Sequence, residues 1–339
     1  MYDLNCNIGT LPCGELNLIT DVDGVSVGHC TLCGGGLNTG VTVVMPCKDN
    51  PFLNKLTAAS FVMNGFGKTQ GLVQIDELGT LETPIALTNT LNVGLVHDAL
   101  TEYMIDICNK SGKRLTSVNP VVCECNDASL NDIQRRAVKK EHVFSAINAA
   151  GKSFDLGDVG CGKGTTCHGL KGGVGSASRI MEIDGKKYTL GALVQTNHGR
   201  LNDLIVNGDP IGARLNAHIN SSVPDKGSCI VIIATDLPVN SRQLKRIIKR
   251  AAAGLARLGS FFGSGSGDVF VGFGTHNRFC GGQAVTFSEV LNEDLLDLPF
   301  RACCEATEEA VLKSLLCAHS VTGQGGITRL SLNELLAEL

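Results

Sequence analysis

A glycine–serine pair at the end of a predicted helix is the first feature of this sequence with an evident chemical use. The stretch NSRQLKRIIKRAAAGLARLG, residues 240–259, carries apolar residues at helical spacing with lysine and arginine opposite, and Ser260 follows it. Because glycine leaves its carbonyl unshielded and permits strained backbone angles, the Ser260 hydroxyl could attack the Gly259 carbonyl. Hydrolysis of the resulting ester would give Ser260 a free amine, whose ordinary pKa of about 7.7–8.0 suits a base. The alternative is a helix-capping glycine followed by a polar loop.

Two polar residues at the ends of predicted strands are candidate binding groups. Glu124, in VVCECNDASLNDI, alternates in phase with Val122 and so faces inward if the strand is half-buried. A buried carboxylate needs a cation or several donors, which a substrate ammonium or an arginine would supply. Asn197 ends the strand LVQTN, where its side-chain N–H could stabilise an oxyanion or the residue could simply form a turn.

The last long helix is predicted from PFRACCEATEEAVLKSLLCAHS, residues 299–320. Thr307 lies near the centre of its apolar stripe and Glu308 at the flank, whereas Glu309 points away with Lys313 one turn on as a solvated partner. We therefore expect Thr307 and Glu308 to be the inward polar groups. The alternative is a hydroxyl bonded to its own helix backbone and a glutamate at the rim.

Glycine-rich segments do not match nucleotide-binding motifs. The loop GSGSGD, residues 263–268, precedes a strand and lacks Gly-Lys-Ser/Thr, so it is not a P-loop. Residues 157–176, GDVGCGKGTTCHGLKGGVGS, lack the Walker spacing and predict either the wall of a pocket or a flexible loop. The sequence also contains no G-x-S-x-G elbow and no H-E-x-x-H.

One cysteine cluster has metal-binding spacing. His29, Cys30 and Cys33, in GHCTLCGG, include a C-x-x-C pair, but no second pair completes a zinc set. We therefore expect no metal and no cofactor. The 15 cysteines lie mostly within apolar runs, which indicates reduced thiols in the cytoplasm.

Composition excludes several classes of protein. The 339 residues are 43% hydrophobic and 18% charged, with a net charge of only -4 and few aromatic residues, so nucleic-acid binding is not expected. The N-terminus lacks a signal-like pattern, and CIVIIATDLPV is of strand length, so no membrane anchor is expected. No repeat or linker divides residues 1–339, which we interpret as one catalytic domain.

The elements that must position these residues are interspersed strands and helices. Apolar segments rich in Val, Ile and Thr predict strands, several of them covered on both faces; they are GVSVGHC, TGVTVVMP, TPIALTNTL, NPVVCEC, YTLGALVQTN, SCIVIIATD and DVFVGFG. Besides the two helices above, helices are predicted at 92–111 and at about 130–150. This pattern predicts a layered α/β sandwich.

Taken together, the motifs resemble the DmpA/BapA family of self-processing serine aminopeptidases, the L-aminopeptidase/D-esterases and β-peptidyl aminopeptidases. The resemblance runs in order from about residue 18 to 326 and rests on segments such as ITDVDGVSVGHCTL, GLKGGVGSASR and ATDLPVNSRQLKRIIKRAAAGLARLGS. It implies an αββα sandwich like that of ornithine acetyltransferase, homo-oligomeric assembly and a small peptide or amino-acid amide as substrate.

The resemblance also implies residue roles. Cleavage between Gly259 and Ser260 would give an α chain, 1–259, and a β chain, 260–339, with Ser260 as the nucleophile. Asn197 resembles the family's oxyanion-hole asparagine.

The acid that holds the substrate amine resembles Glu124. The hydroxyl and carboxylate that orient the nucleophile most resemble Thr307 and Glu308, with Glu309 as the alternative acid.

Departures from the family pattern are Ala128, His198, an apparent insertion at about 276–296, and the cysteine excess. The alternatives to a peptidase are an acyltransferase of the ornithine acetyltransferase type, or an unprocessed, non-enzymatic homologue. The Gly259-Ser260 pair favours hydrolysis, because the transferase nucleophile is a threonine after alanine.

Overall fold

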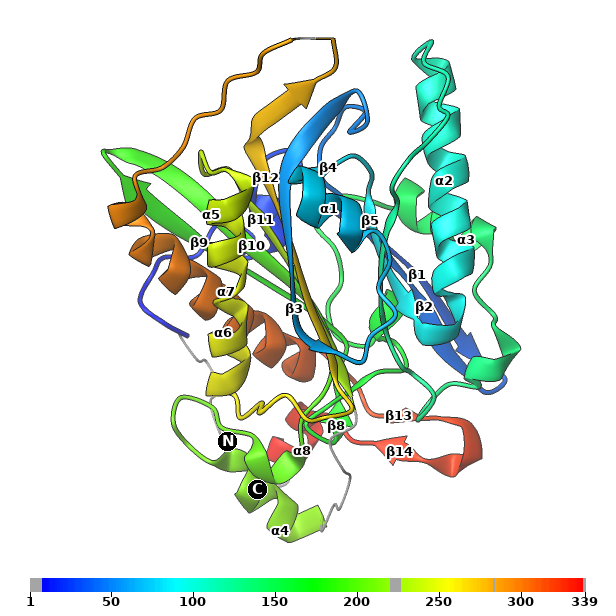
Figure 1. Ribbon diagram of the computed structural model, residues 1–339. Helices are drawn as coiled ribbons and strands as arrows, with labels where there is room; N and C mark the ends of the chain where they lie inside the picture. Colours follow the sequence, from blue (N-terminus) through cyan, green and yellow to red (C-terminus); the bar gives the residue numbers. More distant parts are fainter. Residues whose placement is uncertain (1–7, 220–226, 283, 338–339) are drawn as a thin grey trace.

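Two β-sheets lie face to face between two layers of helices (Figure 1). This arrangement confirms the expected αββα sandwich. The computed structural model describes residues 8–219, 227–282 and 284–337.

The larger sheet contains the strands nearest the candidate nucleophile. In spatial order its strands are β4 (Thr80–Leu81), β3 (Asn54–Gly65), β12 (Gly267–Cys280), β11 (Ser228–Thr235), β10 (Lys186–Asn197) and β9 (Val174–Ile183). Neighbours are antiparallel except β11 and β12, which are parallel.

The smaller sheet has four strands in the order β1 (Ser26–Gly34), β2 (Leu37–Met45), β5 (Ile85–Asn89) and β6 (Val121–Cys125). Its one parallel pair is β5 and β6, so both strands end at the same edge, with Thr88 beside Glu124. All seven predicted strands occur, whereas β3 and β9 were not predicted.

Alternation along the strands divides the interior into three apolar layers. In β11, Val231 and Ile233 pack toward the helices α5 (Ser241–Ile248), α6 (Ala251–Arg257) and α7 (Asp297–Leu316), while Ile230 and Ile232 pack between the two sheets. A third layer joins the outer face of the small sheet to α2 (Val93–Lys110) and α3 (Lys140–Asn148). Each sheet is thus covered on both faces, which explains why several strands are apolar throughout.

The helices differ from expectation in two places. The outer helices of the small sheet are α2 (Val93–Lys110), as predicted, and α3 (Lys140–Asn148), which is shorter than the predicted 130–150 because only a 3-10 turn, Ile133–Arg135, forms before it. On the large sheet, the predicted 240–259 helix is divided into α5 (Ser241–Ile248) and α6 (Ala251–Arg257).

The last long helix, α7, spans Asp297–Leu316 and crosses the outer face of the large sheet beside α6 (Figure 1). The remaining helices are α1 (Leu72–Leu78), α4 (Ile211–Ile219) and α8 (Leu332–Ala337). Two short hairpins pair β7 (Thr166–Cys167) with β8 (Leu170–Lys171), and β13 (Val321–Thr322) with β14 (Thr328–Arg329). Within residues 8–219, 227–282 and 284–337 we find no helix with the length and apolar character that crossing a membrane requires.

Candidate active site

The Gly259-Ser260 peptide lies in a turn that only glycine can form. Gly259 has φ +97°, and a Cβ on it would overlap the carbonyl oxygen of Asp203. The adjacent Leu258 carbonyl accepts a hydrogen bond from the Ile205 N–H at 3.3 Å. The end of α6 is thus pressed against the segment that follows β10, in a conformation that side chains disfavour.

Ser260 itself is only 7% exposed, and its N–H donates to the Leu255 carbonyl at 3.2 Å. Within the described part of the chain, its hydroxyl makes no hydrogen bond to another residue. The Oγ is therefore not held by a side chain in the uncut polypeptide.

The loop after Ser260 is fixed by two neighbouring segments. The Arg200 guanidinium lies over the Phe261 ring, with its central carbon 4.9 Å from the ring centroid. The Asn64 amide, near the end of β3, donates to the Gly263 carbonyl at 2.6 Å, and the Phe66 N–H donates to the Ser266 carbonyl at 3.3 Å. The loop is thus anchored to both β3 and the segment after β10.

The Asn197 side chain has a defined orientation. Its Nδ2 donates to the Asn126 carbonyl at 2.9 Å, and its Oδ1 accepts from the Thr166 N–H at 3.1 Å. A carbonyl can only accept and a backbone N–H can only donate, so the amide cannot be flipped. Because Nδ2 carries two hydrogens, one N–H remains for an oxyanion.

Glu124 is a buried carboxylate that accepts hydrogen bonds from neutral groups. It is 2% exposed, and its oxygens accept from the Lys68 backbone N–H at 2.9 Å and from the Thr90 hydroxyl. The Lys68 ammonium is bonded instead to the Phe66 carbonyl at 2.6 Å. No ion pair to Glu124 occurs among the described residues, so the arginine alternative is not realised there.

The structure brings these groups to one end of the two sheets. Glu124 and the Asn126 carbonyl, which holds Asn197, are two residues apart on the same chain segment. Asn197 is paired with Ser228, whose hydroxyl accepts from the Gly267 N–H at 3.1 Å, at the start of β12. The segments bearing Glu124, Asn197 and Ser260 are therefore assembled around one edge.

Thr307 and Glu308 lie one layer away, at the contact between α6 and α7. A Cβ on Gly254 would come within 2.9 Å of the Thr307 Cβ and 3.0 Å of the Glu308 nitrogen, so Gly254 permits the close approach of the two helices. The Thr307 hydroxyl is fully buried and has no hydrogen-bond partner within the described residues. It is therefore not bonded to its own helix backbone, as the alternative interpretation would require.

Glu308 interacts with the end of α6, the helix that precedes Ser260. Its Oε2 accepts from Arg257 Nη1 at 3.0 Å, three residues before Ser260. Among the described residues, neither Glu308 nor Thr307 is hydrogen-bonded to Ser260.

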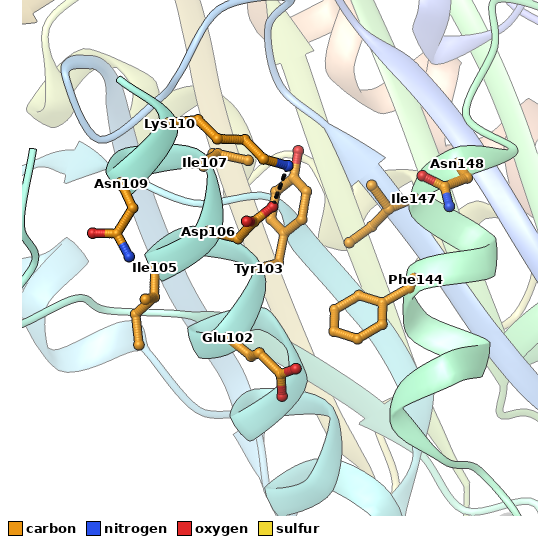
Figure 2. A pocket seen from close by; sticks show the side chains of 10 residues that line it. All are labelled: Glu102, Tyr103, Ile105, Asp106, Ile107, Asn109, Lys110, Phe144, Ile147 and Asn148. Atoms are coloured by element: carbon orange, nitrogen blue, oxygen red, sulfur yellow. Dashed lines mark hydrogen bonds and ion pairs between the residues drawn. The ribbon is translucent and has the colours of Figure 1, made fainter. Parts of the chain in front are cut away.

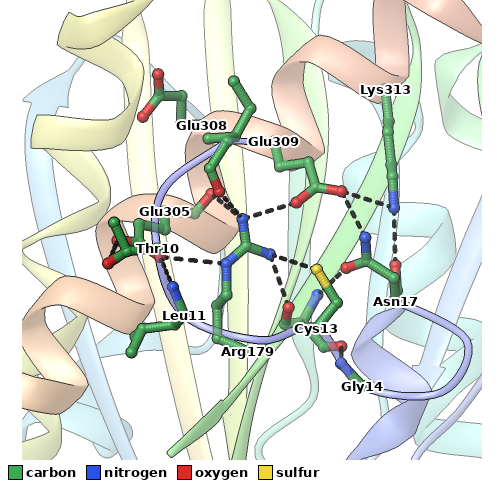
Figure 3. A network of polar contacts seen from close by, with 12 residues as sticks. Thr10, Leu11, Cys13, Gly14, Asn17, Arg179, Glu305, Glu308, Glu309 and Lys313 are labelled. Carbon is green, nitrogen blue, oxygen red and sulfur yellow. Dashed lines mark hydrogen bonds and ion pairs between the residues drawn. The ribbon is translucent and has the colours of Figure 1, made fainter. Parts of the chain in front are cut away.

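The expectation that Glu309 would be solvated is wrong. Figure 3 shows Glu309 directed into a buried network, where it pairs with Arg179 at 2.7 Å and Lys313 at 3.1 Å and accepts from Asn17 at 2.5 Å. Helical spacing does not reveal this orientation, because Arg179, which is fully buried on β9, attracts a carboxylate on the sheet-facing side of α7. Its guanidinium also contacts Glu305 at 3.4 Å.

A buried lysine organises the glycine-rich segment 157–176. The Lys171 ammonium donates to the carbonyls of Gly162, Thr165 and Gly172 at 2.9, 2.7 and 2.5 Å. Burial lowers the pKa of Lys171 to about 7, although the nearby Asp158 carboxylate opposes that shift. The segment is thus a packed wall beside Asn197 rather than a flexible loop. No pattern in the sequence indicated this role of Lys171.

The C-x-x-C cluster does not form a metal site. Both His29 ring nitrogens are bonded, to the Thr42 hydroxyl at 2.8 Å and to the Asp155 carbonyl at 3.1 Å. Cys30 and Cys33, three residues apart on β1, lie on opposite faces of that strand.

A surface groove lies elsewhere on the molecule. It has a volume of about 580 Å³ and is bordered by α2 and α3, with Tyr103 and Phe144 facing each other across it (Figure 2). None of the predicted site residues lines this groove.

Comparisons with known proteins agree with this architecture. The model of peptidase family S58 matches residues 17–329. The β-peptidyl aminopeptidase BapA of Sphingosinicella microcystinivorans is 40% identical over 93% of this chain and 85% of its own. The crystal structure of the PH0078 protein from Pyrococcus horikoshii OT3 superposes with a TM-score of 0.92 at 45% identity, covering 98% of this chain and 96% of that one.

A third relative relates the fold to a mechanism class. The L-aminopeptidase D-Ala-esterase/amidase of Ochrobactrum anthropi, described as a prototype of the serine aminopeptidases and a variant of the Ntn hydrolase fold, gives a TM-score of 0.90 at 32% identity, covering 97% of this chain and 94% of that one. The fold and its site thus define a hydrolase of the Ntn type. The chain belongs to peptidase family S58. This confirms the expected peptidase and favours it over the acyltransferase and the non-enzymatic alternatives.

Proposed function

We propose that this peptidase cleaves itself between Gly259 and Ser260 and then removes N-terminal residues from small peptides, amides or esters, with Ser260 as nucleophile. The observation that carries the substrate class is Glu124, a buried carboxylate whose hydrogen-bond donors in the described part of the chain are all neutral. A buried negative charge is costly unless a cation compensates it. The ammonium of a substrate N-terminus is such a cation, and it distinguishes an aminopeptidase from an endopeptidase.

Self-cleavage begins with attack of the Ser260 Oγ on the Gly259 carbonyl carbon. The C–N bond breaks, the nitrogen leaves as the α-amine of Ser260, and water hydrolyses the ester. The products would be chains 1–259 and 260–339. We expect them to remain associated, because β12 of the second chain lies between β3 and β11 of the first.

Peptide hydrolysis repeats this chemistry on a bound substrate. The Ser260 amine accepts the hydroxyl proton as Oγ attacks the first carbonyl of the substrate. The second N–H of Asn197 stabilises the tetrahedral oxyanion, the proton passes to the leaving amine, and water then releases the acyl group.

Thr307 and Glu308 are proposed as positioning residues. Glu308 holds Arg257 and so the last turn of α6, and Thr307 fills the contact at Gly254. Both would act on Ser260 through the placement of α6.

We also propose that the protein is a cytoplasmic homo-oligomer. Val285 and Phe287, which lie between β12 and α7, are 69% and 94% exposed, as expected of side chains that a partner covers. Buried thiols such as Cys123 and Cys125 fit a reducing compartment. Light scattering after size exclusion would measure the mass, and a monomer at micromolar concentration would contradict the assembly.

The test of the substrate class compares an amino-acid amide with its N-acetylated form. The wild-type enzyme should hydrolyse the free amine far faster, and Glu124→Gln should raise KM for that substrate and reduce the discrimination. Glu102→Gln, a change of an exposed glutamate on α2, is the matched control. Equal hydrolysis of both substrates by the wild type would exclude the proposed role of Glu124.

A further inference from the structure

We propose that Cys167, His168 and His198 form a zinc site beside the Asn197 amide. One thiol sulfur and two imidazole nitrogens, one from each side chain, lie within 4.8 Å of one another, and all three residues are buried. This inference does not depend on the proposed function.

Backbone geometry holds the three side chains together. His168 and Gly169 form the two-residue turn between β7 and β8, with φ +49° and +74°, the left-handed pair of a type I′ hairpin. The His168 N–H donates to the His198 carbonyl at 2.7 Å, which fixes the hairpin to the end of β10. Gly199 has no side chain where the His168 ring lies, since a Cβ there would come within 2.6 Å of that ring.

The ring nitrogens of His198 are a second, independent observation that points to a bound ligand. The residue is 3% exposed, and both of its ring nitrogens are buried without a hydrogen-bond partner among residues 8–219, 227–282 and 284–337. A polar group that is buried without a partner is energetically costly, and a metal ion bound to one ring nitrogen would remove that cost for this nitrogen.

His168 is in the tautomer that a metal requires. Its Nδ1 lies 3.1 Å from the Arg200 carbonyl, which can only accept, so Nδ1 carries the proton. The lone pair of the neutral ring is then on Nε2. A carbonyl bonded to the other nitrogen is the usual outer partner of a metal-binding histidine.

Zinc fits this donor set best. It binds thiolate at about 2.3 Å and imidazole at about 2.0–2.1 Å in tetrahedral geometry, which puts ligand atoms roughly 3.3–3.6 Å apart. The ligand atoms lie within 4.8 Å of one another, so the longest separation would have to shorten by about 1 Å when zinc binds. Binding releases the Cys167 thiol proton to solvent, because the ligand is the thiolate.

The metal would act on the candidate active site through the backbone. Asn197 precedes His198, and Thr166, whose N–H donates to the Asn197 Oδ1, precedes Cys167. The zinc ligands His198 and Cys167 would thus be the next residues in the chain after Asn197 and Thr166, whose hydrogen bond orients the Asn197 amide. Three protein ligands leave the fourth tetrahedral position of the zinc ion to a water molecule.

The test measures metal content directly. The full chain is produced in medium supplemented with zinc and purified without chelators, and metal is measured by elemental mass spectrometry. We expect zinc close to equimolar with the chain, and X-ray absorption should report one sulfur and two nitrogen neighbours. Wild-type protein that holds only trace metal would overturn the proposal, as would a shell without sulfur.

Variants assign the metal to these residues. Cys167→Ser and His198→Phe should each lower the zinc content at least tenfold, while Cys317→Ser, which changes an exposed cysteine outside the cluster, should leave it unchanged. Protein grown with Co²⁺ should show sulfur-to-cobalt absorption that Cys167→Ser lacks. If all variants retain the wild-type content, the metal is bound elsewhere and the assignment is wrong.

Discussion

Replacing Gly259 with alanine is the sharpest perturbation of the scissile turn. Gly259 has φ +97°, well outside the usual left-handed well of L-residues, and its Cα faces the Asp203 carbonyl with no room for a methyl group. Alanine would have to leave this conformation or push α6 away from the segment that follows β10. Either movement displaces the Ser260 hydroxyl from the carbonyl that it attacks.

The magnitude follows from the backbone strain. Holding a non-glycine residue in a sparsely populated φ/ψ region costs about 1–3 kcal/mol. If the attack needs the observed turn, this cost adds to the barrier and slows cleavage about 5- to 150-fold. The steric overlap with Asp203 adds to this energetic cost, so we expect the decrease in the cleavage rate to lie in the upper part of the 5- to 150-fold range.

The assay follows the conversion of full-length chain to two fragments on denaturing gels after rapid purification. Gly185→Ala is the matched control, because Gly185 also has a positive φ, +74°, but faces open space in the turn between β9 and β10. It should lower stability slightly and cleave at the wild-type rate. Wild-type cleavage by Gly259→Ala in a folded protein would refute the reasoning.

Three further substitutions test other parts of the account. Asn197→Ala should lower kcat about 10²- to 10³-fold in a peptide amide assay while the protein stays folded, because one oxyanion donor is lost; an unchanged kcat would reject that role. Arg179→Met should lower the free energy of unfolding, measured in urea, by about 3–5 kcal/mol, because the buried carboxylates of Glu305 and Glu309 lose their cation. Lys110→Met, which removes an exposed ion pair, is the control and should change the free energy of unfolding little. Equal effects of the two substitutions would contradict the stabilising role of the buried Arg179 network. The folded pKa of Lys171, about 7, is below its unfolded value of about 10.4, so its burial is most destabilising at low pH and the penalty is relieved as pH rises from 7 toward 10. In an uncut Ser260→Ala background, Lys171→Met should therefore weaken the rise of unfolding free energy between pH 7 and 9, and identical slopes would contradict the lowered pKa.

The sequence predicted the layers of the fold because burial on both faces makes strands uniformly apolar. The helix over 92–111 and the strands around Glu124 and Asn197 occur as expected. β3 was missed because NKLTAASFVMNG mixes polar and small residues, and it becomes a strand by pairing with β12 and β4. That pairing joins distant segments, which local patterns do not report.

Long-range contacts also explain the errors at the site. Glu309 was assigned to solvent from helical spacing alone, yet Arg179, more than a hundred residues earlier, holds it in the interior. The cluster of Cys167 and His198 was equally invisible, since a tight turn and a strand end separated by some thirty residues bring it together. Spacing predicts partners one turn apart but not those that the sheet order places side by side.

The central claim is that the bond between Gly259 and Ser260 is cleaved by the protein itself. Intact-mass analysis with N-terminal sequencing of freshly purified protein tests it most directly. We predict two fragments, 1–259 and 260–339, the smaller beginning Ser-Phe-Phe, and a single uncut chain for Ser260→Ala. Folded wild-type protein that stays uncut yet hydrolyses peptide amides, or a second chain that begins at another residue, would contradict it.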